Sequence, residues 1–247
     1  MNRREFLIGL GAAGAGACLP AVASPARECK VIGIGAAGCN LATALRASNI
    51  LDRAGAVVSY VCVDLGPDSL HFVEVANEAN PARPPIKTLM LAPLRAGGNV
   101  NAARAACLRH RVILAEMLAG SDMVVLLAGL GGGTGSGISP IMARLARATG
   151  AVTVAAVVTP FDFEGAARNR RADAVINRLQ HEADLVMTFS NEEWINRFSG
   201  DDSFLAIWDA LDRHVAESVW AIVEPSNKSD DVAGTTHGCL RRRPNAH

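Results

Sequence analysis

The chain has 247 residues, of which 50% are hydrophobic and 4% aromatic, and its formal net charge at pH 7 is zero. A chain of this length and hydrophobic content can bury one sizeable core, so we expect a single globular domain with short appendages. The balanced charge argues against a general nucleic-acid binder, and no spacing of Cys and His residues suggests a zinc site.

The first 26 residues are expected to be a targeting segment and not part of the fold. Arg3 and Arg4 precede a short apolar stretch over residues 8–17, and residues 21–23 (Ala-Val-Ala) offer a small-residue cleavage site. This order is typical of twin-arginine export signals. It predicts export to the periplasm, unless the arginine pair is accidental.

From residue 30 onward, continuous apolar runs alternate with amphipathic runs, which predicts strands alternating with helices. The expected fold is α/β, a three-layer sandwich with a mainly parallel sheet covered on both faces. We assign this domain to residues 27–223 and expect residues 224–247 to be a polar tail with no fold of its own. The predicted strands are 30–34, 56–63, 123–128, 152–158 and 185–189, and the predicted helices are 40–47, 102–119, 141–149, 168–183 and 204–222, with a loop over 77–85.

The densest glycine run lies between a predicted strand and a predicted helix. Residues 129–137 read Gly-Leu-Gly-Gly-Gly-Thr-Gly-Ser-Gly. With so few side chains in the turn, backbone N–H groups and the N-terminus of the following helix can surround a small anion. The run contains no lysine, so it is not the Gly-x-x-x-x-Gly-Lys phosphate loop. A phosphate held here would be neutralised by amides, the helix dipole and a cation.

An earlier glycine motif permits a different interpretation. Gly33, Gly35 and Gly38 form a Gly-x-Gly-x-x-Gly motif after the first predicted strand, and Asp64 follows the second. This arrangement predicts an NAD-dependent oxidoreductase with Asp64 on a ribose hydroxyl, although Asp64 could equally be a turn residue. A pyrophosphate needs only one such loop, whereas a nucleoside triphosphate could use this loop and the run at 129–137.

Taken together, these segments resemble the tubulin/FtsZ superfamily of GTP-binding filament proteins. Residues 129–137 look like its signature phosphate loop. Residues 31–40 resemble its first nucleotide loop, with alanines at two positions where glycine is usual. Residues 96–99 resemble the loop that reaches the terminal phosphate, and residues 159–168 resemble the ribose loop of bacterial FtsZ. The resemblance implies the Rossmann-like nucleotide-binding domain of that family.

The resemblance also implies GTP or GDP as the ligand, with Mg2+ as its companion ion and no metal-ligating residue assigned. Glu164 and Arg168 would contact the sugar, while Asn191, Trp208 and Asp212 would bind the base. A carboxylate can accept both N–H groups on the guanine edge, and residues four apart share a helix face. The residues implied to contact the nucleotide are Gly35, Ala36, Ala37, Asn40, Asp64, Gly97, Gly98, Asn99, Gly131, Gly132, Gly133, Thr134, Gly135, Ser136, Glu164, Arg168, Asn191, Trp208 and Asp212.

Several of these assignments have a purely structural alternative. Trp208 fits the apolar stripe of the last predicted helix as a core residue, and Asp212 could be a solvated charge or the partner of a neighbouring basic residue. Glu164 and Arg168 have the spacing of a surface ion pair, and Asn191 could be a turn residue at a strand end.

The resemblance ends at the last predicted helix. Family members continue into an acidic loop, which completes the nucleotide site of the neighbour in a filament, and into a second domain, but nothing after Glu224 matches either. We therefore expect GTP binding with weak or absent hydrolysis, and no residue is assigned as a catalytic base. Self-association or an FtsZ-like filament partner is expected, with a role in cell division or the cytoskeleton. A non-catalytic interaction module that retains the fold is a further alternative.

The compartment stays open at this point. Members of the resembled family work in the cytoplasm, where GTP is available, whereas the leader predicts export.

Overall fold

The computed structural model describes residues 28–48, 50–51, 57–93, 96–198 and 203–223. The expected targeting segment (1–26) and polar tail (224–247) lie outside the described residues. No helix in the described part of the chain combines the length and apolarity that a membrane crossing requires.

Six strands form one central, fully parallel sheet in the order β3-β2-β1-β4-β5-β6. Strands β1 and β4 are neighbours at its centre, where Ile34 pairs with Ala128, so the direction of strand addition reverses between them. Their apolar runs are buried, as expected for a sheet covered on both faces. The strands are β1 (Glu28–Ile34), β2 (Val57–Asp64), β3 (Lys87–Met90), β4 (Met123–Gly129), β5 (Val152–Thr159) and β6 (Leu185–Ser190).

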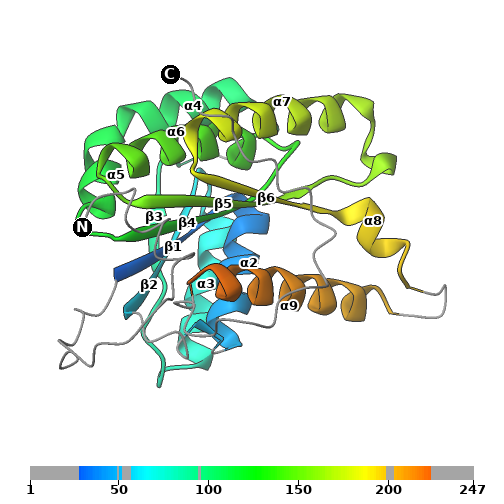
Figure 1. Cartoon of the computed structure of the whole chain (residues 1–247), viewed down its shortest axis with the longest axis horizontal. Coiled ribbons are helices and arrows are strands. Elements are labelled where there is room, and N and C mark those ends of the chain that lie inside the picture. Colours follow the sequence, from blue (N-terminus) through cyan, green and yellow to red (C-terminus); the bar gives the residue numbers. More distant parts are fainter. Residues whose placement is uncertain (1–27, 49, 52–56, 94–95, 199–202, 224–247) are drawn as a thin grey trace, which may run out of the picture.

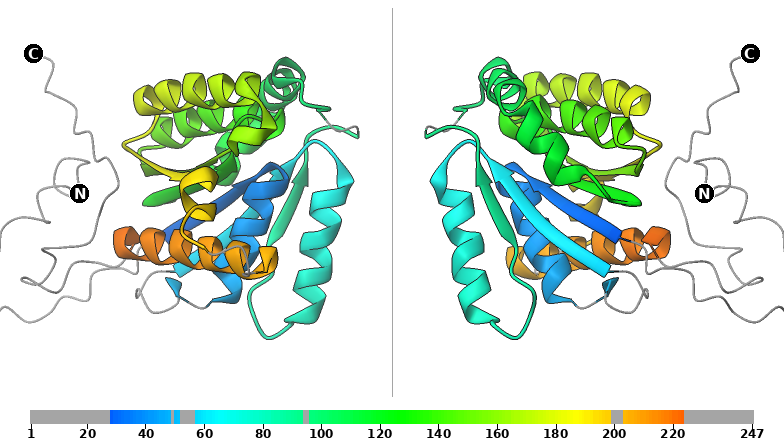
Figure 2. Two further views of the ribbon diagram at one scale, coloured as in Figure 1. Left: turned by 90° about the vertical axis from the view of Figure 1, so that its right-hand side faces the viewer. Right: turned by 90° about the vertical axis from the view of Figure 1, so that its left-hand side faces the viewer.

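Helices cover both faces of this sheet, which confirms the predicted three-layer α/β fold (Figure 1). Helices α4 to α7 pack on one face, and α2, α3 and α9 pack on the other, so each face has its own apolar core. Figure 2 shows α9 running beneath the sheet, on the side opposite α6 and α7. The helices are α2 (Gly35–Ala47), α3 (Pro67–Ala79), α4 (Val100–Arg109), α5 (Arg111–Leu118), α6 (Thr134–Ala148), α7 (Ala166–Glu182), α8 (Asn191–Ile195) and α9 (Phe204–Val223).

Two of the sequence-based assignments are wrong. The predicted loop over 77–85 begins inside α3, and the predicted helix over 102–119 is two helices that meet at His110. Helix α3 and strand β3 were not predicted at all. Only Leu70 and Val73 of α3 are buried, so its apolar periodicity is weak, and β3 is a four-residue edge strand.

Helices α2 and α6 begin earlier than expected, inside their glycine motifs. Helix α2 starts at Gly35 and α6 starts at Thr134, whereas the apolar periodicity predicted starts at residues 40 and 141. Glycine has a poor intrinsic helix propensity, so tertiary packing, and not local preference, places these first turns.

Helix α8 is held against α9 by Trp194. The Trp194 Nε1–H donates to the Ile207 carbonyl at 3.1 Å, and its ring stacks on His214 with centroids 4.9 Å apart. Burial, and the nearby positive charge of Arg197, lower the pKa of His214. This contact anchors the chain between the last strand and the last helix.

Close packing of α2 on the sheet depends on Gly38. A Cβ atom built on Gly38 would lie 2.2 Å from the carbonyl oxygen of Leu127 in β4, and one on Gly33 would lie 2.6 Å from the carbonyl oxygen of Gly38. The backbones of α2, β1 and β4 therefore touch directly. This contact fixes the N-terminus of α2 at the carboxyl ends of the two central strands.

Replacing Gly38 with alanine is expected to destabilise the fold by about 1–3 kcal/mol, because the added methyl group overlaps a buried carbonyl. In a helix interior, alanine normally gives about 1 kcal/mol more stability than glycine. A loss of stability in Gly38→Ala would therefore be opposite in sign to the effect of helix propensity. Urea unfolding of Gly38→Ala measures the effect. Gly132→Ala is the matched control, because a Cβ there meets nothing within 4 Å. Equal stability of the two variants would contradict the packing role of Gly38.

Candidate functional site

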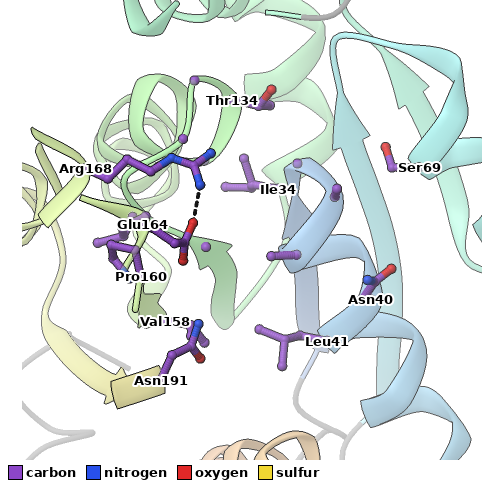
Figure 3. Close-up of a pocket in the computed structure, with 18 of the residues that line it drawn as sticks. Ile34, Asn40, Leu41, Ser69, Thr134, Val158, Pro160, Glu164, Arg168 and Asn191 are labelled. Atoms are coloured by element: carbon purple, nitrogen blue, oxygen red, sulfur yellow. Dashed lines mark hydrogen bonds and ion pairs between the residues drawn. The ribbon is translucent and has the colours of Figure 1, made fainter. Parts of the chain in front are cut away.

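A cavity of about 1040 Å³ opens at the carboxyl ends of the strands, where ligands of open parallel sheets bind (Figure 3). Segments that follow β1, β2, β4, β5 and β6 line it, together with one side of α9. Most residues predicted to contact a nucleotide lie in its wall. These are Gly35, Ala36, Ala37, Asn40, Asp64, Gly97, Gly98, Gly132, Gly133, Thr134, Gly135, Glu164, Arg168, Asn191, Trp208 and Asp212.

Two helix N-termini meet in this cavity. Helix α2 begins at Gly35 and α6 begins at Thr134, and a Cβ atom built on Gly35 would lie 3.1 Å from the Thr134 Cβ. Neither helix has a side-chain N-cap hydrogen bond or an acidic residue in its first turn. Their first backbone N–H groups and positive dipole ends therefore remain for an anionic ligand.

A third glycine segment joins these two helix ends. A Cβ atom on Gly133 would lie 2.9 Å from the Ala96 Cβ and 3.0 Å from the carbonyl carbon of Gly98. Gly97 and Gly98 have φ angles of 54° and 79°, which favour glycine and turn the loop toward α6. Three glycine segments that are far apart in the sequence thus form one backbone-lined wall.

Three predicted contact residues do not line the cavity and instead support the loops. The Asn99 Oδ1 accepts hydrogen bonds from the backbone N–H groups of Asn101 and Ala102 and caps α4. Ser136 is only 3% exposed, and its Oγ accepts a hydrogen bond from the backbone N–H of Gly131 at 2.9 Å. These contacts support the glycine loops through residues that do not line the cavity.

Glu164 and Arg168 form the ion pair that their spacing predicts. Arg168 Nη1 donates to Glu164 Oε2, and Glu164 Oε1 accepts from the backbone N–H of Phe161 at 3.0 Å. Both side chains also line the cavity, where Figure 3 shows the pair opposite Ile34 and Thr134. Glu164 and Arg168 therefore form the ion pair of the structural alternative and also line the cavity.

One wall of the cavity is aromatic. Phe161 stacks on Phe163 with centroids 4.8 Å apart and meets Trp208 edge-on at 5.7 Å. Trp208 packs against the apolar core behind it, and Phe163 is 75% exposed. Trp208 thus combines a core contact with a place in the wall, and aromatic faces of this kind can stack against a planar ring.

Polar acceptors lie beside this aromatic wall. Burial raises the pKa of Asp212 to about 6, with a smaller contribution from the negative charge of Asp209. Asn191 is 8% exposed, and its Oδ1 has no hydrogen-bond partner among the residues that the structure describes. A buried amide oxygen without a partner is costly, so a ligand with N–H donors would stabilise this end of the cavity.

The start of α3 adds a part of the site that the sequence did not reveal. Asp68 and Ser69 lie in the cavity wall, and Asp64 accepts hydrogen bonds from the backbone N–H of Leu65 at 2.7 Å and from the Ser69 hydroxyl. The turn role considered for Asp64 is therefore present in the structure. Because α3 itself was not predicted, only the position of Asp64 after a strand could have indicated this wall.

The charges of the wall are mostly negative. The ionisable side chains that line the cavity are Asp64, Asp68, Glu164, Arg168 and Asp212, so carboxylates outnumber guanidinium groups. Within the described ranges, no cluster of three or more His, Cys, Asp or Glu side chains could hold a metal ion by itself. An anion in this cavity would be held by backbone amides and accompanied by a cation of its own.

Comparison with known proteins identifies the relatives of this chain. Residues 28–199 match the sequence model of the family described as "Tubulin/FtsZ family, GTPase domain". The cell division protein FtsZ of Pseudomonas aeruginosa is 33% identical over 198 residues, which cover 78% of this chain and 46% of that protein. FtsZ of Mycoplasmopsis pulmonis is 39% identical over 134 residues, covering 53% of this chain and 34% of that protein. The chain thus spans about half the length of the curated relatives it matches.

Solved structures show the same architecture. The empty FtsZ dimer of M. jannaschii has a TM-score of 0.67 and 26% identity, covering 87% of this chain and 59% of that chain. The GTPγS-bound CetZ2 protofilament of Haloferax volcanii has the same TM-score at 24% identity, covering 83% of this chain and 60% of that chain, and shows a shared fold. Since the family match covers most of the described residues and the same fold recurs in these relatives, the chain belongs to the tubulin/FtsZ family through its GTPase domain.

Proposed function

We propose that this chain binds GTP and GDP in the cavity at the carboxyl ends of the strands. The observation that carries this proposal is the meeting of two uncapped helix N-termini, those of α2 and α6, in one backbone-lined wall. Such helix ends hold phosphate through N–H donors and their dipoles. The family match supports guanosine nucleotides as the ligand.

The other end of the cavity suits the nucleoside. The edge-on pair of Phe161 and Trp208 offers an aromatic surface for the base, and Asp212 lies one helical turn from Trp208. Guanine presents two adjacent N–H donors, which a single carboxylate can accept together. Arg168 and Glu164 then lie at the sugar, between the base and the phosphates.

A cation is expected to accompany the phosphates. The cavity wall carries more carboxylates than guanidinium groups, so a bare triphosphate would be repelled. Mg2+ is commonly held by phosphate oxygens, water and one or two carboxylates, and Asp64 and Asp68 are oxygen donors of that kind. The Mg2+ would neutralise the phosphates where the glycine loops cannot.

The strand order alone does not separate this proposal from a dinucleotide-dependent oxidoreductase. Dinucleotide-binding domains share the order 3-2-1-4-5-6, and the Gly-x-Gly-x-x-Gly motif is present here. The second helix end at Thr134 and the third glycine segment favour a ligand with more phosphate oxygens than a pyrophosphate has. NAD is therefore the competing ligand in the binding test.

We also propose that the chain associates with copies of itself or with a filament-forming FtsZ. The supporting relatives are named cell division proteins, and two structural neighbours are a dimer and a protofilament. A chain that retains the fold without turnover would act in such an assembly as a binding module.

In the first test, calorimetry is expected to give a Kd on the order of 1–10 μM for GTP and GDP in Mg2+, and at least about 100-fold weaker binding of ATP and NAD. Removing Mg2+ with EDTA should weaken GTP binding.

Asp212→Asn should lose about tenfold in affinity for GTP and GDP, because an amide cannot accept both guanine donors. Asp209→Asn removes the same charge one turn away, outside the cavity wall, and should bind normally. Preference for NAD, or equal behaviour of the two variants, would overturn the assignment.

The affinity for GDP should also depend on pH through Asp212. Its carboxyl has a pKa of about 6 in the folded protein, and guanine binding needs the ionised form. Between pH 7.5 and pH 5.0 the ionised fraction falls about tenfold, so the affinity should fall by about that factor. The phosphates of GDP also titrate between pH 7.5 and pH 5.0. The affinity of Asp212→Asn for GDP measures the effect of that phosphate titration alone. Identical pH profiles for the two proteins would exclude Asp212 as the acceptor.

Hydrolysis of GTP by the chain alone is expected to be slow. Glu164 is paired with Arg168, and Asp64 accepts two hydrogen bonds at the start of α3, so neither carboxylate offers an unengaged base. Phosphate release should be at least about tenfold below that of Pseudomonas aeruginosa FtsZ under the same conditions. Comparable turnover would contradict this part of the proposal.

A further inference from the structure

A second, smaller cavity of about 200 Å³ lies between α4, α6 and α7. Figure 1 shows these helices side by side on one face of the sheet. Its apolar lining comes from all three helices, and no acidic residue belongs to its described wall. Three arginines complete that wall: Arg104 from α4, and Arg171 and Arg178 from α7.

Gly137, which lines this cavity, allows two of its helices to touch. A Cβ atom on Gly137 would lie 2.7 Å from the carbonyl oxygen of Val100 and 2.8 Å from the Ala103 Cβ. The first turn of α6 therefore touches the first turn of α4, which brings Arg104 beside α6. Arg171 and Arg178 are seven residues apart, so they project from the same face of α7.

The ionisable side chains that line the cavity are all positive, although the whole chain has no net charge. Helices α4 and α6 contain four arginines and no carboxylate, and the two carboxylates of α7, Asp173 and Glu182, do not line the cavity. Within the described part of the chain, Arg104 and Arg178 form no ion pair. Guanidinium groups gathered without counter-charges repel one another and attract an anion.

We propose that this cavity binds a small organic anion that carries a carboxylate or phosphate group on a short apolar stem. Guanidinium groups pair with either oxyanion through two parallel N–H donors. The side chains of Val100, Ile141 and Val175 form an apolar floor, which suits the carbon part of a ligand and not a bare inorganic ion. The volume lies below the range of about 300–1000 Å³ for drug-sized ligands, so a compact anion of few carbons fits.

The cavity is connected to the glycine loop of the larger site. Arg171 Nη1 donates to the carbonyl oxygen of Gly131 at 2.7 Å, and Ser136, which lines the small cavity, accepts from the N–H of the same Gly131. An anion that pairs with Arg171 draws its guanidinium charge away from the phosphate loop. Binding in the small cavity should therefore weaken nucleotide binding, a consequence that rests on the proposed function.

The direct test is calorimetry on the full chain without nucleotide, using glutarate, phenyl phosphate and inorganic phosphate as separate titrants. We expect glutarate or phenyl phosphate to bind and inorganic phosphate to bind at least about tenfold more weakly, because it cannot use the apolar floor. The tighter of the two organic anions indicates whether the natural ligand carries a carboxylate or a phosphate. Binding of neither, or equal binding of phenyl phosphate and inorganic phosphate, would overturn the proposed ligand class.

Matched variants assign the binding to this cavity. Arg104→Gln and Arg178→Gln should each lower the affinity about tenfold, because each removes a charged donor. Arg144→Gln removes an exposed arginine of α6 outside the cavity and should bind the anion normally. Equal affinity in all three variants would place the anion elsewhere, such as at the glycine loops, and would reject the site.

The coupling has its own readout. The Kd for GTP should rise about threefold or more when the organic anion is saturating, and Arg178→Gln should need about tenfold more anion to produce the same rise. Unchanged GTP affinity with a bound anion would reject the coupling and leave the site standing. Failure of GTP to bind at all would reject the proposed function, whereas the titrations without nucleotide would still decide the site.

Discussion

Direct contact between main chains, made possible by glycine, is the constraint on which the site depends. A Cβ atom on Gly38 would collide with a carbonyl of β4, and one on Gly135 would lie 2.1 Å from the carbonyl oxygen of Gly129 at the end of the same strand. These two contacts lock α2 and α6 onto the central strands at their first turns. The positive ends of both helices therefore face one cavity, and under the proposed function the backbone would take the role that lysine has in other phosphate loops.

The glycines of the run at 131–137 have different tasks, which spacing alone could not reveal. Gly132 faces open space in the cavity, while Gly133 meets the loop at 96–98. Gly137 faces away from that cavity and lets α4 approach α6. The sequence predicted a single function for the whole run, namely exposure of amides to an anion. Gly133 and Gly137 instead serve packing between elements that are distant in the sequence.

How far the sequence predicts the fold depends on how completely an element is buried. The strands that end at Ile34 and Gly129 were found readily, because continuous apolar runs identify strands buried on both faces. Helix α3 escaped prediction because only Leu70 and Val73 contact the core. Because α3 was not predicted, Asp68 and Ser69 were not identified, and one wall of the cavity could not be predicted. Most residues of the recognised loops lie in the cavity wall, since parallel strands end at one edge of the sheet, whereas Asn99, Gly131 and Ser136 do not line it.

The placement of the aromatic side chains has a practical consequence. The sequence contains three tryptophans, and all of them lie on α8 and α9: Trp194 stacked on His214, Trp208 in the cavity wall and Trp220 near the end of α9. The arginine-rich layer of α4 to α7 contains none. The intrinsic tryptophan fluorescence of this protein therefore reports changes at the larger cavity and at α9. It does not report directly on the helices that cover the opposite face of the sheet.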